Sequence, residues 1–190
     1  DLAACQPTYP AHYPDPTKLA NTGKVNTHPI GRSTKSYAGY RNNDKKFLDT
    51  KLSFKYDAPF IKGLSARAVF VSNLLYGYTK HWTKEFYYYN YNRTTDTYTL
   101  GGISQNSKTA LTENLDRANN FTTQLYLTYV KTIGAHNLDA LLLGEFIQND
   151  GNYFNAYREN YLSTSIDQLF AGGNLGKNNG GGQNQDGRIS

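Results

Sequence analysis

Four stretches of the chain alternate between apolar and polar residues, a period-2 pattern that predicts β-strands. We expect these strands near residues 47–57, 64–79, 120–131 and 137–147. In the first stretch, one phase is mainly apolar and the other is mainly charged after Phe47. The apolar phase consists of Leu48, Thr50, Leu52, Phe54 and Tyr56. Because successive side chains of a strand point to opposite faces, each stretch predicts one dry face and one wet face.

The connections between these stretches alternate in length. The first two strands are separated only by residues 58–63, and the last two by residues 132–136, which predicts two antiparallel hairpins. We expect the segments 1–45, 80–119 and 148–190 to be long loops. Within 80–119 we expect a protruding hairpin with its turn near Asp96, and within the last segment a flexible tract from Gly173 to Gly187.

Short turns on one side and long loops on the other are typical of outer-membrane barrels. Tilted strands of about ten residues also match the thickness of the hydrocarbon layer. The sequence therefore predicts an all-β fold, in which antiparallel strands and hairpins form part of a transmembrane β-barrel with long extracellular loops.

The same pattern assigns the two faces of the strands. A charge on the lipid-facing side costs about 2–4 kcal/mol near the midplane, so the apolar phase is expected to contact lipid. The residues expected to face lipid are Leu52, Phe54, Phe70, Leu74, Leu125, Leu127, Leu142 and Phe146. The residues expected to face the barrel lumen are Asp49, Lys51, Lys55, Arg67, Gln124 and Glu145.

Composition supports a membrane boundary more than a soluble core. The chain has 17 Tyr, 9 Phe and 1 Trp but no Met, and tyrosine suits sites that are apolar on one side and wet on the other. The net charge of +5 comes from scattered basic residues, so we predict no nucleic-acid partner. Cys5 is the only cysteine, which excludes a disulfide within the chain. Leu2 to Cys5 resembles a lipoprotein cleavage site, but only Asp1 precedes it.

No catalytic, metal or cofactor site is predicted. The four histidines, His12, His28, His81 and His136, are dispersed and lack metal-ligand spacing. Carboxylate pairs such as Asp139 with Glu145 could in principle serve glycoside hydrolysis. Each pair shares one phase of a half-solvated strand, so a polar lumen is the simpler interpretation, and we predict that the protein is not an enzyme.

Four segments resemble one known family. They are Leu48–Val71, which includes Lys55–Asp57 and Pro59–Ser65, then Gly134–Glu145, Arg158–Tyr161 with Ile166–Gly172, and more weakly His28–Ile30 with Ala38–Tyr40. In this order they resemble the barrel of SusC/RagA-like TonB-linked outer-membrane proteins.

The resemblance implies a plug domain inside a barrel of about twenty-two strands, a size typical of plugged transporters. It also implies import of large nutrients, typically oligosaccharides or peptides, across the outer membrane of Bacteroidetes-type bacteria. A SusD-like surface lipoprotein would act as a lid, and the TonB complex would supply energy through parts not in this chain. The plug is absent from these residues, so the chain is expected to be an internal barrel segment of about four membrane strands.

An aromatic cluster precedes the predicted protruding hairpin. Aromatic faces stack on sugar rings, so the candidates for contact with ligand or with the lid protein are Trp82, Tyr87, Tyr89 and Tyr91. The alternative is an interfacial aromatic girdle with ordinary loop packing.

Two other functions remain open. The first is a soluble or surface-exposed β-sandwich that binds carbohydrate, although the low apolar content of 38% disfavours a closed core. The second is a secreted structural or adhesive β-protein, which the Asn- and Gly-rich tail weakly favours.

Overall fold

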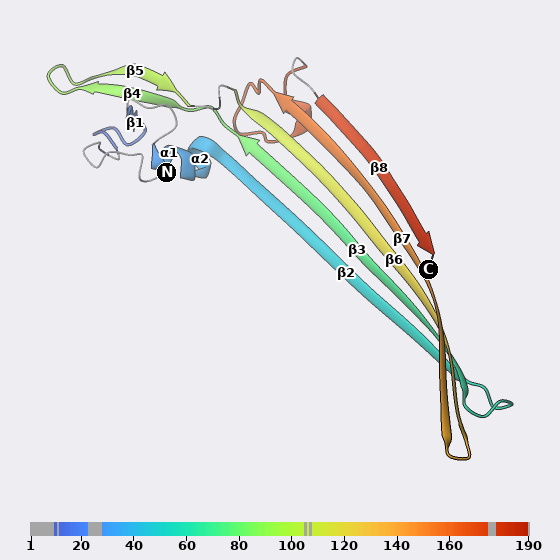
Figure 1. The fold of residues 1–190 in the computed structure, drawn as a ribbon. Helices are drawn as coiled ribbons and strands as arrows, with labels where there is room; N and C mark the ends of the chain where they lie inside the picture. The colour runs from blue at the N-terminus through green and yellow to red at the C-terminus, as the bar shows by residue number, and fades with distance from the viewer. Residues whose placement is uncertain are drawn as a thin grey trace. The chain divides into compact units, whose positions relative to one another are not determined.

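The computed structural model describes residues 10, 12–22, 28–104, 106, 108–174 and 178–189. It consists mainly of antiparallel sheets, with 66% strand and 7% helix, so the predicted all-β class is confirmed (Figure 1). Cys5 and most of the first ten residues lie outside the described part, as do residues 175–177 of the predicted tail.

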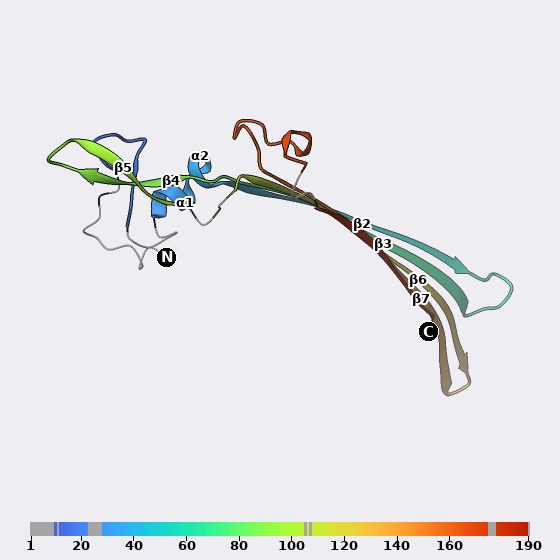
Figure 2. The same ribbon diagram turned by 90° about the horizontal axis from the view of Figure 1, so that it is seen from above.

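The larger sheet has five strands in the order β2-β3-β6-β7-β8. Strands β2, β3, β6 and β7 run side by side in both views (Figures 1 and 2). Each contains one of the four predicted strands. Their bounds, with that of the fifth strand, are β2 Gly39–Asp57, β3 Leu64–Thr83, β6 Ala110–Ile133, β7 His136–Glu159 and β8 Asn178–Ile189.

The predicted loops were too long in three places. β2 begins eight residues before Phe47, β6 begins at Ala110 inside the expected loop, and β7 continues to Glu159. The fourth difference is β8, which occupies most of a tract expected to be flexible. The reason is that main-chain hydrogen bonds to a neighbouring strand extend a strand whatever its side chains are, so alternation marks only part of each strand.

The two short connections turn at glycine. Gly63 has φ +90° before β3, and Gly134 has φ +60° between β6 and β7. Such positive φ values are accessible to glycine at little steric cost. A β-carbon at Gly63 would also clash with the carbonyl oxygen of Val130, so this turn fits closely against β6.

A smaller sheet has the order β1-β4-β5. Its strands are β1 Leu19–Ala20, β4 Tyr87–Asn92 and β5 Thr97–Ile103, with β1 parallel to β4 and β4 antiparallel to β5. The predicted hairpin with its turn near Asp96 is therefore confirmed.

Two short helices lie in the segment that was expected to be loop, α1 Pro29–Ser33 and α2 Lys35–Ala38. The expectation that 1–45 forms a loop throughout was wrong here, because proline, as at Pro29, is tolerated at the first helical position. The His28 side chain also caps α1 by accepting a hydrogen bond from the Gly31 amide at 3.3 Å. A 3₁₀ turn, η2 Leu169–Ala171, lies between β7 and β8.

The chain divides into two compact units. Unit 1 comprises 1–43, 79–113 and 155–179, and unit 2 comprises 44–78, 114–154 and 180–190. Within unit 1, Leu19, Phe86 and Tyr88 form a buried cluster. In unit 2, Val69 is the only buried hydrophobic residue among those described, although many large apolar side chains are exposed. Unit 2 therefore has an apolar surface that its own described residues do not cover.

Candidate functional site

One face of unit 2 exposes a field of large apolar side chains. Phe54 is 63% exposed, Leu125 57% and Leu142 68%. The rings of Phe54 and Phe70 meet edge to face, with centroids 6.3 Å apart, so these two strands present their aromatic residues on the same face. Exposed apolar area of this extent marks a surface that another apolar phase or a partner covers.

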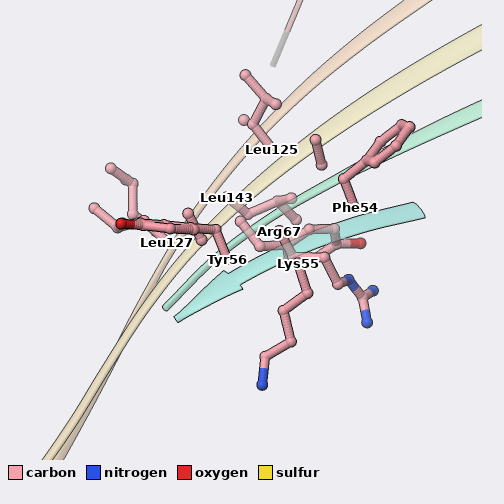
Figure 3. A pocket seen from close by; sticks show the side chains of 12 residues that line it. Phe54, Lys55, Tyr56, Arg67, Leu125, Leu127 and Leu143 are labelled. Carbon is pink, nitrogen blue, oxygen red and sulfur yellow. The ribbon is translucent and has the colours of Figure 1, made fainter. Parts of the chain in front are cut away.

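A groove of about 650 Å³ crosses this field. Its walls carry Phe54, Tyr56, Leu125, Leu127 and Leu142, and small residues such as Ala66, Ala68 and Gly144 line it between them. Figure 3 shows Phe54 and Leu125 on one side of the strands, while the Lys55 and Arg67 chains extend away from that side.

The opposite face of unit 2 carries a chain of polar contacts across three strands. The Arg67 guanidinium lies 4.6 Å from the Tyr126 ring centroid, and the Tyr126 hydroxyl donates to Gln124 Oε1 at 2.9 Å. Gln124 in turn donates through Nε2 to Glu145. On β2 and β3, Asn73 Nδ2 donates to Asp49 Oδ1 at 2.7 Å. These polar side chains therefore satisfy one another's hydrogen bonds across neighbouring strands.

The structure contains a contact within each of the two predicted sets of residues. Contacts link Phe54 with Phe70 in the first set and Gln124 with Glu145 in the second. Leu141 and Leu143 share the phase of Glu145 and are also exposed, so β7 is apolar on both faces over this short stretch. Whether the first set contacts lipid stays a prediction.

Trp82 does not fit its predicted role. It is only 1% exposed, and its ring meets Tyr161 edge to face with centroids 4.6 Å apart. A buried indole cannot stack on a ligand, so Trp82 is a packing residue of unit 1 in this structure. The sequence pattern could not reveal this, because Tyr161 lies on a segment far away in the chain.

The three tyrosines are more accessible. Tyr87 is 40% exposed, and its hydroxyl donates to Glu85 Oε1 at 2.8 Å, which raises the pKa of Tyr87. The ammonium of Lys18 lies 4.3 Å from the ring centroid of Tyr89. A cation over an aromatic face is a favourable contact that also exposes a charge beside the ring.

Tyr91 belongs to a group of three rings. It stacks on Tyr98 with centroids 4.9 Å apart, and Tyr13 lies 5.5 Å from Tyr91 and 5.9 Å from Tyr98. We call Tyr13, Tyr91 and Tyr98 the tyrosine triad. The pairing of Tyr91 with Tyr98 follows from a hairpin turn near Asp96, so sequence could have found Tyr98, whereas nothing in the pattern pointed to Tyr13.

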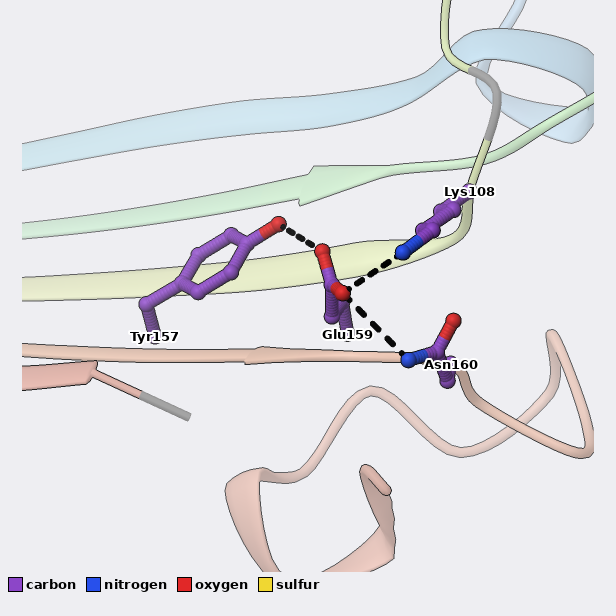
Figure 4. Close-up of polar contacts among 4 residues, drawn as sticks. All are labelled: Lys108, Tyr157, Glu159 and Asn160. Atoms are coloured by element: carbon purple, nitrogen blue, oxygen red, sulfur yellow. Dashed lines mark hydrogen bonds and ion pairs between the residues drawn. The ribbon is translucent and has the colours of Figure 1, made fainter. Parts of the chain in front are cut away.

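Glu159, at the end of β7, holds the segments around it by polar contacts (Figure 4). Lys108 Nζ donates to its Oε1 at 2.8 Å, the Tyr157 hydroxyl donates to Oε2 at 2.8 Å, and Asn160 Nδ2 donates to Oε1 at 3.3 Å. The Lys108 ammonium, followed by the Tyr157 hydroxyl, lowers the pKa of Glu159. The arrangement is a structural tie between the start of β6 and the end of β7.

A second polar group fastens the segment after β7. Lys80 Nζ lies 3.4 Å from Asp167 and 3.8 Å from Glu113, and the Tyr40 hydroxyl donates to Asp167. The hydrogen bond from Tyr40 lowers the pKa of Asp167, burial raises it, and the charge of Lys80 lowers it again. The net effect is a lowered pKa of Asp167. Nearby, burial raises the pKa of Tyr161 to about 12.

Among the described residues, no group of three or more His, Cys, Asp or Glu side chains is placed to hold a metal ion. None of the helices in this described part is long and apolar enough to cross a membrane. No protein-family model matches the chain, and no curated protein matches it either.

Proposed function

We propose that this chain is a barrel segment of a TonB-dependent, SusC/RagA-like transporter in the bacterial outer membrane. The transporter imports a large nutrient, of which an oligosaccharide is the leading class. The observation that carries the proposal is the exposed apolar face of unit 2, on long antiparallel strands whose other face carries polar contacts. Lipid is a solvent that covers such a face without any further protein element.

The connection lengths support the same proposal. Both short turns, 58–63 and 134–135, belong to unit 2. The long connections 84–109 and 160–177 belong to unit 1 and carry β4, β5 and η2. Short turns at one end and elaborated loops at the other are typical of outer-membrane barrels.

In this proposal the long loops lie on the extracellular side. There the tyrosine triad, with Tyr87 and Tyr89, contacts the oligosaccharide or a SusD-like lipoprotein. Aromatic rings with nearby hydroxyl and ammonium groups suit the apolar faces and hydroxyls of sugars. The TonB complex acts through parts of the transporter outside this chain, and no step of the proposal involves catalysis.

The alternative is a soluble or surface-exposed carbohydrate-binding β-sandwich. The tyrosine triad is compatible with it. A sandwich, however, buries the inner face of each sheet against a second sheet. In unit 2 the candidate inner face stays exposed among the described residues, and this weighs against the sandwich.

The test is to identify the native gene product in fractionated cells by mass spectrometry of peptides from this chain. We expect the peptides in the outer-membrane fraction, from a protein several times larger than 21.4 kDa. A soluble product near 21.4 kDa would overturn the transporter and leave the sandwich. Deleting the gene should then abolish growth on one class of glycan while growth on monosaccharides continues.

A further inference from the structure

Small side chains on β3 form the middle of the apolar groove of unit 2. Ala66 and Ala68 line it from β3, beside Phe54 on β2 and Leu125 and Leu127 on β6. Because β3 lies between β2 and β6 in the sheet, larger side chains stand on both sides of the two alanines. The groove is thus a trough of about 650 Å³, which has room for an unbranched hydrocarbon chain.

Along β6, the face that carries the groove changes from apolar to aromatic to basic. Leu125 and Leu127 line the groove, and Tyr129 and Lys131 follow at steps of two residues. Residues two apart on a strand share one face, so Tyr129 and Lys131 continue the face of the groove toward the short turns.

Contacts on the opposite face show that this alternation is unbroken. Gln124 donates to Glu145, and Thr132 Oγ1 donates to Asn137 Oδ1 at 2.8 Å. From Gln124 to Thr132 and from Asn137 to Glu145 is eight residues in each case, so β6 and β7 keep one register between these pairs. Lys131, next to Thr132, therefore faces the side of the groove.

A second lysine reaches the same end of the groove from the turn between β2 and β3. The Val130 amide donates to the Gly63 carbonyl at 2.8 Å. Lys62 precedes Gly63 and Lys131 follows Val130, so this hydrogen bond brings the two lysines near each other. Both are exposed, and within the described part of the chain neither forms an ion pair.

The carboxylates near this end lie on the other face. In the sequence, Asp57 and Asp139 are the only acidic residues of the stretches 56–66 and 127–142. Asp57 pairs with Lys55 at 3.0 Å, and the Lys55 chain extends away from the groove (Figure 3). Asp139 is three residues from Leu142 of the groove and so has the opposite phase. The positive charge beside the groove is therefore not neutralised.

This order of residues matches the layers of half a bilayer. At about 3.3 Å per residue, Lys131 lies roughly 13 Å along β6 from Leu127. Half of the hydrocarbon core is about 15 Å thick, so an acyl chain in the groove brings its headgroup to the lysines. Tyr129 lies between them, where a ring that is apolar on one side and polar on the other suits the membrane boundary.

We propose that the groove holds one acyl chain of an anionic phospholipid and that Lys62 and Lys131 contact the phosphate of its headgroup. The inference rests on the proposed function, because it takes the apolar face of unit 2 to lie in a bilayer. It goes further, since general coverage by lipid requires no selectivity for a charged headgroup.

Native mass spectrometry of the whole outer-membrane protein in detergent tests the inference. The probes are dioleoyl phosphatidylglycerol, which is anionic, and dioleoyl phosphatidylcholine, which has the same acyl chains and no net charge. We expect the first phosphatidylglycerol to bind about tenfold or more tightly, because each lysine near an anionic headgroup accounts for a factor of about five. Equal binding of the two lipids overturns the inference.

Substituting the lysine locates the headgroup. Lys131→Gln should weaken phosphatidylglycerol about fivefold and leave phosphatidylcholine unchanged. The matched control is Lys51→Gln, an exposed position on β2 whose phase is opposite to that of Phe54, which should change neither. An equal loss in both variants would mean attraction by overall charge and overturns the site.

Filling the trough locates the acyl chain. Ala68→Leu should remove the preference for phosphatidylglycerol, whereas Ala140→Leu, in the phase of Leu142 but outside the groove, should leave the preference unchanged. An unchanged preference in Ala68→Leu overturns the groove as the site. A dimer that Ala68→Leu separates would mean that a second copy covers the groove, which overturns the lipid. Heat-dependent mobility on a denaturing gel establishes that both variants are folded.

The failures of the two proposals can be told apart. A product in the outer membrane that binds both lipids equally refutes the lipid site and keeps the transporter. A soluble product in the fractionation refutes the transporter, and the bilayer setting of the groove with it.

Discussion

Leu127→Arg compared with Gln124→Arg is the sharpest test of the two faces. Leu127 lies in the apolar groove of unit 2 and is 44% exposed. Gln124, three residues earlier on β6, contacts Glu145 and Tyr126 on the other face. The two positions therefore sit on one strand and differ mainly in which face they present.

The expected magnitudes follow from the medium on each face. If lipid covers Leu127, an arginine there costs about 2–4 kcal/mol near the midplane. At Gln124, an arginine keeps a donor toward Glu145 and adds an opposite charge, so we expect a change of about 0–1 kcal/mol. In water, a substitution at a half-exposed leucine usually changes stability by no more than about 0.5 kcal/mol.

The assay is assembly of the whole protein in the outer membrane, followed by heat-dependent mobility on a denaturing gel, and urea unfolding in lipid vesicles. We expect Leu127→Arg to abolish or strongly reduce assembly and Gln124→Arg to assemble normally. A result in which both variants assemble and unfold alike would refute the assignment of the faces. Leu127→Ala controls for the loss of the leucine itself.

Three further outcomes are expected. Trp82→Ala should lower the free energy of unfolding by about 3–5 kcal/mol, since the indole is 1% exposed, and a change below about 1 kcal/mol in urea unfolding would refute this packing role. Gly63→Ala should cost at least about 1–2 kcal/mol, because Gly63 has a positive φ and an added β-carbon would clash with the backbone carbonyl of Val130. Gly144→Ala, where an added β-carbon meets no atom within 4 Å, should be nearly neutral in the same assay. Because the pKa of Glu159 is lowered in the folded state, its carboxylate stabilises the fold at pH values above the unfolded pKa of about 4.3. This contribution to stability is lost as the pH falls through the lower pKa of the folded state. Lys108→Gln should therefore flatten the fall of the urea midpoint between about pH 5 and pH 3, and an unchanged pH profile would contradict the tie.

Alternation located four strands well because apolar residues of unit 2 gather on one face of each of them, apart from a short stretch of β7 around Leu141 and Leu143. Phe54 and Leu127 stand out against charged neighbours, and a period of two follows directly from strand geometry. The same reasoning missed the first part of β2 and most of β8, where the neighbouring strand supplies backbone hydrogen bonds and the side chains carry little signal.

The site residues were less predictable, because their partners are distant in sequence. The sequence predicts Trp82 as an exposed aromatic residue, whereas in the structure its ring packs against Tyr161. Arg41 lies in a segment expected to be loop, and its proximity to His81 depends on the pairing of β2 with β3. Periodicity within one stretch carries no information about such contacts.

The lengths of the connections also set the order in which the strands can pair. Closing a loop costs more conformational entropy as the loop lengthens, so β2 with β3, and β6 with β7, can form first as hairpins within about 1–10 μs. The junction of β3 with β6 must wait until residues 84–109 are brought back, and the β4–β5 hairpin shortens that search by folding within it. β8 pairs last, across residues 160–177, so the sheet grows by two hairpins and then by one single strand.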